Sequence, residues 1–269
     1  MKTVSRSLVE KENASFLKNE NICMSKSELA IILPVTNEIK YLTEAVNETV
    51  AWAGKISDDW HIIIAEDGSS DGSTELAHQL GAERKNISVL HNDLKLGRGK
   101  AVKRAMKLFD AEIYAYFDVD LAADMMFFPM LIDKVKMGYD IVTGSRYIKG
   151  AAFSRPLLRL IASKVYNWMV RALFHSQVCD HQCGFKAFSR RVRDELLDEC
   201  KSDDWLWDTE IVVLGTRSNF KIHEFPVEWR EKRFKKTPLG RLIEDVKIHG
   251  IGLLKLYWRV NSRGGNTGS

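Results

Sequence analysis

Short apolar runs alternate with segments of helical periodicity over the first half of the chain. The runs of strand length are residues 29–35, 61–66, 87–91, 113–118 and 140–145. The segments with helical spacing or helix start signals are residues 38–53, 73–80, 97–109 and 126–137. Strands that alternate with helices are typical of a parallel, doubly wound sheet, so the pattern predicts an α/β fold.

Polar side chains follow four of these apolar runs at the point where each run ends. They are Thr36, Asn37 and Glu38, then Glu66 and Asp67, then Asp118 and Asp120, then Ser145 and Arg146. In a doubly wound sheet, ligands bind outside the carboxyl ends of the strands. We therefore expect these four groups to lie along one edge of the sheet and to form the functional site.

Asp118 and Asp120 come directly after the apolar run "IYAYF" and are two residues apart. Two carboxylates at this spacing can hold one divalent ion, and oxygen ligands favour Mg²⁺ or Mn²⁺. A solvated loop is the plainer alternative for an isolated Asp-x-Asp pair. Arg98 and Lys100 open the helix predicted at 97–109, where a helix N-terminus favours anionic groups. Together these residues suggest a site for a metal ion and a phosphate-bearing ligand.

The second half of the chain has a different pattern. Residues 154–174 and 238–260 are predicted as amphipathic helices that carry tryptophan and basic residues. In the first of them, the apolar side holds Leu157, Leu160, Ile161, Val165, Trp168 and Ala172, and the basic side holds Arg155, Arg159, Lys164 and Arg171. Such helices are typical of an interfacial membrane contact, although they could instead cap the core of the sheet.

Composition narrows the classes of partner. The 269 residues carry a net charge of +4, yet no acidic residue occurs between Asp140 and Asp180. A basic sector of this kind suits phosphate, nucleic acid or an anionic membrane surface. No nucleic-acid motif is visible, so a nucleic-acid partner is not expected. The histidines and cysteines at positions 175–183 match no strong zinc spacing either, which leaves phosphate ligands and a membrane surface.

Seven ordered motifs between residues 29 and 260 resemble the family 2 glycosyltransferases of the GT-A fold. The motifs are LPVTNE, EDGSSDGS, KLGRGKA, YFDVDLA, TGSRY, DHQCGFKAFSR and WLWDTE. Within that family, the sequence is most similar to the archaeal branch of the dolichyl-phosphate mannose and glucose synthases. The processive Gln-x-x-Arg-Trp motif is absent, which favours transfer of a single sugar.

The resemblance implies a role for individual residues. It assigns the metal to Asp118 and Asp120, and a catalytic role to these two together with Asp180 and Asp208. Nucleotide-sugar contacts are expected from Pro34, Thr36, Glu38, Glu66, Asp67, Asp118, Val119, Asp120, Arg233 and Lys236. Lys100 joins this set because of its place at the start of a predicted helix. Contacts to the acceptor phosphate are expected from Arg146, Arg159, Ser163 and Gln182. Two positions depart from the family pattern: Ala122 replaces a polar residue, and Glu66 replaces an aspartate.

The resemblance implies a metal-dependent, inverting transfer from a nucleotide sugar to dolichyl or polyprenyl phosphate, for glycan assembly such as protein glycosylation. UDP-glucose or UDP-N-acetylglucosamine is favoured as the donor, with GDP-mannose as the alternative. A non-catalytic sugar-nucleotide binding protein is the alternative from a different class.

We expect a flexible lead-in over residues 1–28, a catalytic domain over 29–237, and an amphipathic helix and tail over 238–269. No apolar run reaches the about 20 residues of a membrane span, so peripheral attachment to the cytoplasmic face of the membrane is expected.

Overall fold

The computed structural model describes residues 26–154, 157–230, 232 and 239–262, with the side chains of 239–247 left out. The predicted lead-in up to residue 25 lies outside the described residues, as do Arg155, Arg233 and Lys236.

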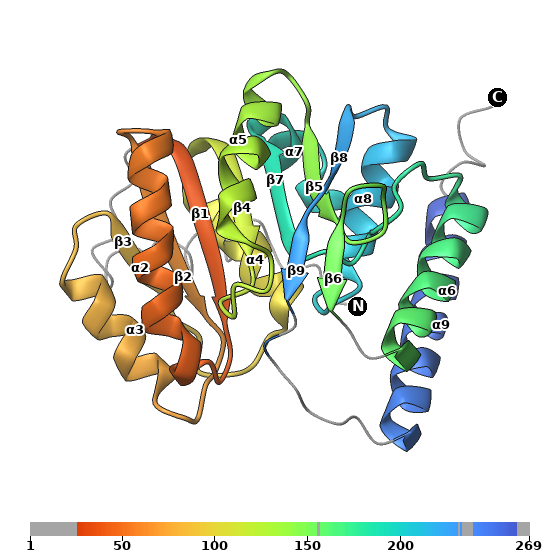
Figure 1. The fold of residues 1–269 in the computed structure, drawn as a ribbon, viewed down its shortest axis with the longest axis horizontal. Coiled ribbons are helices and arrows are strands. Elements are labelled where there is room, and N and C mark those ends of the chain that lie inside the picture. Colours follow the sequence, from red (N-terminus) through yellow and green to blue (C-terminus); the bar gives the residue numbers. More distant parts are fainter. Residues whose placement is uncertain (1–25, 155–156, 231, 233–238, 263–269) are drawn as a thin grey trace, which may run out of the picture.

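A twisted, mostly parallel sheet forms the centre of the described structure (Figure 1). Its strand order is β3-β2-β1-β4-β7-β5-β8, and β7 is the antiparallel member. The strands are β1 (Ser27–Val35), β2 (Trp60–Glu66), β3 (Ile87–Leu90), β4 (Ala111–Phe117), β5 (Ile141–Ser145), β7 (Phe185–Ser189) and β8 (Ile222–Pro226). The predicted α/β class is confirmed, and each of the five predicted strands is present.

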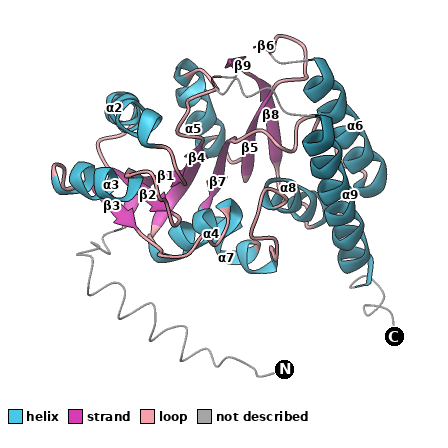
Figure 2. Ribbon diagram, turned by 90° about the horizontal axis from the view of Figure 1, so that it is seen from below, coloured by secondary structure: helices cyan, strands magenta, loops and turns pink. Residues whose placement is uncertain are grey.

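Helices cover both faces of the sheet, because the strands are apolar on both sides and leave two faces to bury (Figure 2). One face packs against α2 (Ile39–Ile56), α3 (Ser73–Ala82) and α5 (Phe128–Lys136). The other packs against α4 (Arg98–Leu108), α7 (Arg190–Glu195) and α8 (Trp207–Arg217). Short 3₁₀ turns occur at Met125–Phe127 and Leu197–Glu199.

The pairing of the strands brings the polar groups to one edge. Val35 pairs with Glu66 and Ile32 pairs with Tyr116, so β1, β2 and β4 end close to the same level. β7 lies between β4 and β5 and was not predicted. Because β7 runs antiparallel, the residues that precede it, rather than those that follow it, lie at this edge. The motif around Asp180 and Gln182 therefore joins the same site.

Two further elements lie beside the sheet. The short strands β6 (Ala152–Ser154) and β9 (Glu228–Arg230) pair in parallel. The helices α6 (Leu157–Phe174) and α9 (Leu239–Ser262) lie side by side at the right of Figure 1. They pack on each other and on α8 through Tyr166, Val170, Phe174, Val213, Leu253, Leu256 and Val260.

The apolar stripe predicted for α6 faces outward. Trp168 is 67% exposed, and Leu157, Ile161 and Val165 are exposed as well. The face that packs inward is instead the one with Ser163, Tyr166 and Val170 among its buried residues. The described part of α9 repeats this arrangement, because Ile248, Ile251, Leu254 and Trp258 are exposed. The helix pair thus buries one face and presents a second apolar face to the outside.

Candidate active site

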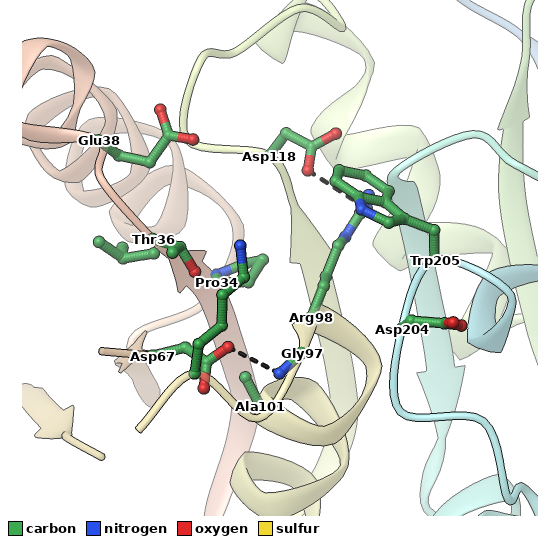
Figure 3. Close-up of a pocket in the computed structure, with 12 residues that line it drawn as sticks. Pro34, Thr36, Glu38, Asp67, Gly97, Arg98, Ala101, Asp118, Asp204 and Trp205 are labelled. Atoms are coloured by element: carbon green, nitrogen blue, oxygen red, sulfur yellow. Dashed lines mark hydrogen bonds and ion pairs between the residues drawn. The ribbon is translucent and has the colours of Figure 1, made fainter. Parts of the chain in front are cut away.

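A cavity of about 380 Å³ opens at the carboxyl ends of β1, β2 and β4 (Figure 3). Besides Arg98, five predicted site residues line it, namely Pro34, Thr36, Glu38, Asp67 and Asp118. They come from three strand ends that are far apart in the sequence, and the sheet brings them together. The size is in the range of small-ligand pockets, and the lining is rich in groups that recognise polar ligands.

Asp67 builds the floor of the cavity by holding a loop. Its carboxylate accepts hydrogen bonds from the backbone N–H groups of Leu96 (2.7 Å) and Gly97 (2.9 Å). Gly97 has a φ of 103°, which a residue with a side chain adopts only under strain. The Gly-Arg-Gly turn that opens α4 is therefore fixed against β2 by a charge-assisted contact.

Glu66 lies behind Asp67 and is buried. Its carboxylate accepts from the backbone N–H of Ser69 (2.7 Å) and pairs with His91 Nδ1. Burial acts to lower the pKa of His91, but its contacts with Glu66 and Asp93 outweigh burial and raise that pKa. The structure thus gives Glu66 the role of shaping the turn after β2, and its predicted contact with the nucleotide stays a prediction.

Arg98 extends from the start of α4 into the cavity and reaches Asp118 (Figure 3). Its Nη2 lies 3.2 Å from Asp118 Oδ1. The guanidinium stacks between the rings of Trp205, at 4.5 Å, and Tyr116, at 5.3 Å. Burial acts to lower the pKa of Arg98, but the carboxylates of Asp118, Asp208 and Asp120 outweigh it and raise the pKa. A fixed positive charge therefore faces the predicted metal carboxylates.

Asp118 and Asp120, the predicted metal pair, would hold a hard divalent ion whose other ligands come from substrate and water. Asp118 lines the cavity, and Asp120 is close enough to Arg98 to act on its charge. Among the described residues, no cluster of three or more His, Cys, Asp or Glu side chains offers a complete protein cage. Two carboxylates that share a metal with phosphate oxygens are typical of Mg²⁺ sites. Val119 between them is buried in the apolar core.

Asp208 lies deeper than Asp118, on the first turn of α8. It is fully buried, bonds the hydroxyl of Tyr116, and lies 2.9 Å from Lys186 Nζ and 3.7 Å from Arg98 Nη2. Burial raises the pKa of Asp208 to about 7 against the effect of Arg98, and burial lowers the pKa of Lys186 to about 7. Asp208 does not line the cavity, so the geometry suits it to positioning Arg98.

Arg146 and Asp180, predicted for acceptor binding and catalysis, form one buried ion pair. Arg146 Nε and Nη2 donate to the two carboxylate oxygens of Asp180 at 2.6 and 2.8 Å. Burial acts to raise the pKa of Asp180, but the charge and hydrogen bonds of Arg146 lower it. The bidentate contact fixes the loop before β7 against the end of β5. Direct contact of Arg146 with a phosphate stays a prediction.

The predicted acceptor residues of α6 lie near this loop. Ser163 is buried, and its hydroxyl donates to the Gln182 side-chain oxygen at 3.5 Å. Gly184, two residues further on, lies against both Arg98 and Asp118, since a Cβ added there would come within 2.5 Å of Asp118 Oδ2. Arg159 is half-buried on the same helix, one turn before Ser163. The loop thus connects α6 to Asp118.

Lys100 does not join the other predicted nucleotide contacts. It lines a separate cavity of about 300 Å³ between α4 and the segment that follows α7. Two positions along a helix turn a side chain by about 200°, so Arg98 and Lys100 point to opposite sides. The structure therefore places Arg98, rather than Lys100, in the cavity with Asp118.

Three charged or aromatic lining residues were not predicted: Lys95, Asp204 and Trp205. Lys95 is the first residue of the motif KLGRGKA, so this motif could have predicted it as a site residue. Asp204 and Trp205 precede α8 and reach the cavity only because this segment packs on the turn at Gly97 and Gly99. A Cβ on Gly99 would lie 2.5 Å from Trp207 Cβ, which requires glycine for that approach.

Comparison with known proteins agrees with the class that this geometry indicates. The model of the glycosyl transferase family 2 matches residues 30–197, so the chain belongs to this family. The sheet, with its helices on both faces and its cavity at the strand ends, is the GT-A fold.

Curated relatives include the glycosyltransferase AglD of Haloferax volcanii, which is 38% identical over 239 residues. The match covers 88% of this chain and 38% of that protein, so this chain spans well under half the length of that relative. The dolichyl-phosphate beta-glucosyltransferase ALG5A of Trichomonas vaginalis is 28% identical over 252 residues, which cover 87% of this chain and 76% of that protein.

Solved structures support the fold. Glucosyl-3-phosphoglycerate synthase from Mycobacterium tuberculosis, in complex with Mn²⁺, UDP and phosphoglyceric acid, has a TM-score of 0.63 at 14% identity. The match covers 92% of this chain and 82% of that structure. At this identity the likeness concerns the fold of the two chains.

Proposed function

We propose that this chain transfers one sugar from a nucleotide-diphosphate sugar to a polyprenyl phosphate such as dolichyl phosphate. UDP-glucose is the favoured donor, with UDP-N-acetylglucosamine next. The names of the curated relatives support the glucosyl donor and the lipid acceptor, and the neighbouring structures support a UDP-linked donor with Mn²⁺ or Mg²⁺. Glycan assembly, with protein glycosylation as one use, is the process that such a product would serve.

The observation that carries this proposal is the cavity between Asp67 and the pair Asp118–Arg98. Its Asp67 side offers a rigid turn with polar groups, which suits a base and ribose. Its opposite side carries the partly buried carboxylate of Asp118 beside a fixed guanidinium. A nucleotide sugar suits these two sides: its base and ribose are polar, and its diphosphate would face Arg98 and a divalent ion held by Asp118.

The chain's own residues account for most of the reaction. The guanidinium of Arg98 offers positive charge to the diphosphate that leaves. When bound at Asp118 and Asp120, a divalent ion supplies further neutralisation of that leaving group. A lipid monophosphate has a second pKa of ~6. It is therefore largely dianionic at neutral pH, so it can act as a nucleophile without a strong base. A single in-line attack inverts the anomeric centre.

The acceptor would reach the site along α6. The neighbouring helices α6 and α9 each expose apolar side chains, which suits the boundary of a membrane, as expected of interfacial helices. Within the described residues, no helix combines the length and hydropathy needed to cross a bilayer. Ser163 of α6 contacts Gln182, and Gly184 of the same loop lies against Asp118, so this loop is where we expect the lipid phosphate to bind. Peripheral attachment to the cytoplasmic face is therefore part of the proposal.

Transfer to polyprenyl phosphate from a panel of labelled UDP- and GDP-sugars, with Mg²⁺, Mn²⁺ or EDTA, tests the proposal. The expected result is an acid-labile glycolipid formed from UDP-glucose and lost in EDTA. A product from GDP-mannose alone would replace the donor and keep the reaction class. Nucleotide binding without transfer from any donor would contradict the reaction and favour a sugar-nucleotide binding protein.

A further inference from the structure

One wall of the cavity comes from a segment that has no secondary structure of its own. Residues 201–206, called the wall segment below, precede α8 and carry Asp204 and Trp205 into the cavity. The Trp205 ring lies 4.5 Å from the Arg98 guanidinium, which in turn contacts Asp118. The position of the wall segment therefore affects both the width of the cavity and the placement of Arg98.

The wall segment is held from the α4 side by Lys103. The ammonium group donates to the carbonyl oxygens of Cys200 (3.2 Å) and Ser202 (2.8 Å) and to the Asp203 carboxylate (2.8 Å). The backbone N–H of Lys100 donates to the Asp203 carbonyl at 3.0 Å. These contacts come from α4, the helix that packs on the sheet and also carries Arg98 into the cavity.

The second support comes from Glu210 of α8, whose side chain is fully buried. Its two carboxylate oxygens accept from the backbone N–H groups of Lys201 (2.8 Å) and Ser202 (2.7 Å). A buried carboxylate is stable only where opposite charge and hydrogen bonds replace its lost hydration. The charged partner here is Arg259 of α9, whose Nη2 donates to the same carboxylate.

Packing joins the same two elements. Leu206, the last residue of the wall segment, packs against the apolar cluster formed by α6, α8 and α9. Gly252 of α9 is in close contact with it, since a Cβ there would lie 3.0 Å from Leu206 Cδ2. The wall segment thus rests on α9 at one end and is held through Glu210 at the other.

We propose that Arg259 is a positioning residue of the donor site: through Glu210 it fixes the wall segment, so that the outer helix α9 sets the geometry of the nucleotide-sugar cavity. The inference rests on the proposed function only for the identity of the ligand. Arg259 does not touch the cavity, and its effect passes through the backbone amides of Lys201 and Ser202.

The test compares Arg259→Gln with two matched variants of the full chain. Arg259→Lys keeps a positive charge at the position and is expected to restore part of the effect. Arg217→Gln removes another contact between α8 and α9, the 2.9 Å bond from Arg217 to Asn261, without touching Glu210. The readouts are the affinity for UDP and for GDP with Mg²⁺, and amide hydrogen exchange of residues 200–207.

In Arg259→Gln we expect nucleotide affinity to fall about 5-fold or more and amide exchange at Lys201 and Ser202 to accelerate, as for residues that couple through a packed network. Arg217→Gln is expected to match the wild type in both. In a Glu210→Gln background, Arg259→Gln should have little further effect, because the pair acts as a unit.

Unchanged nucleotide affinity and exchange in Arg259→Gln would overturn the inference, as would equal losses in Arg217→Gln. Failure of the wild type to bind either nucleotide would instead count against the proposed function. The exchange of the wall segment then still decides the inference, because it reports the segment's position without any ligand.

Discussion

The sheet edge and the outer helix pair treat their apolar side chains in opposite ways. At the edge, β1, β2 and β4 bury nearly all of their apolar residues, and carboxylates follow their ends, beside the guanidinium of Arg98 from α4. In α6 and α9, one apolar face is buried and another is exposed, with Trp258 71% exposed. The first arrangement recognises a polar, charged ligand, and the second suits an apolar environment. The proposed transfer of a sugar to a lipid phosphate, with release of a nucleoside diphosphate, would use both.

The difference also shows how each region is held. The edge is fixed by charge-assisted contacts at short distance, such as Asp67 with the amide of Gly97 and Arg146 with Asp180. The helix pair is held chiefly by apolar packing, and the ion pair of Arg259 with the buried Glu210 links α9 to α8. Substitutions at the edge should therefore change catalysis, whereas substitutions of the exposed apolar residues on the outer helices should change membrane binding.

The largest effect is expected from the carboxylates at the edge. Asp118→Asn or Asp120→Asn should reduce transfer by about 100-fold or more, because the leaving diphosphate loses its neutralising metal site. The measurement is turnover with labelled donor, alongside circular dichroism to verify the fold. Asp58→Asn is the matched control and should keep full activity. Asp58 is an exposed carboxylate that precedes β2, at the opposite end of this strand from the cavity. Full activity of wild type in EDTA would contradict the metal role.

A smaller effect is expected on the outer helices. Trp168→Ser and Trp258→Ser should each weaken binding to anionic vesicles by about 10-fold, since each removes about 1–2 kcal/mol of apolar burial in the membrane boundary. Sedimentation with phosphatidylserine-containing vesicles measures it. Turnover with a short, water-soluble acceptor should stay unchanged. Met137→Ser, an exposed apolar residue after α5, is the control, and an equal loss in it would remove the distinction between the two regions.

The smallest effect is expected on the pH dependence of folding stability, through His91 and its contact with Glu66 after β2. The pKa of His91 is raised in the folded protein by Glu66 and Asp93 against the effect of burial. The pair therefore stabilises the fold fully below the unfolded pKa of about 6.5, and this contribution is lost as pH rises through the folded value. The His91→Gln variant should be less stable than wild type by at most about 1 kcal/mol at pH 5.5, because the pair is partly exposed.

Urea unfolding of wild type and His91→Gln between pH 5.5 and 8.5 measures this difference. The gap in unfolding free energy should shrink toward zero at the alkaline end. A gap that grows with pH would show that His91 acts in its neutral form.

The sequence by itself determined the elements of the first half of the fold. Strand-length apolar runs with polar residues at their ends depend on local pattern, so the five strands and the shared edge with Asp67 and Asp118 followed directly. The apolar stripe of α6 was also visible. The sequence did not show whether this stripe faces the protein or the outside, because periodicity reveals an apolar face of a helix but not what lies against it.

Only the tertiary structure decided which charged groups meet. The antiparallel β7 enters the sheet between two strands that precede it in the chain, and this placement brings Asp180 to Arg146 and Gly184 to Asp118. Arg98 rather than Lys100 reaches the cavity because α4 packs with the Arg98 side of the helix toward Asp118. Trp205 lines it because α8 packs on the Gly97–Gly99 turn. These contacts join residues far apart in the chain, so they depend on packing and on charge pairing across elements, which no local pattern contains.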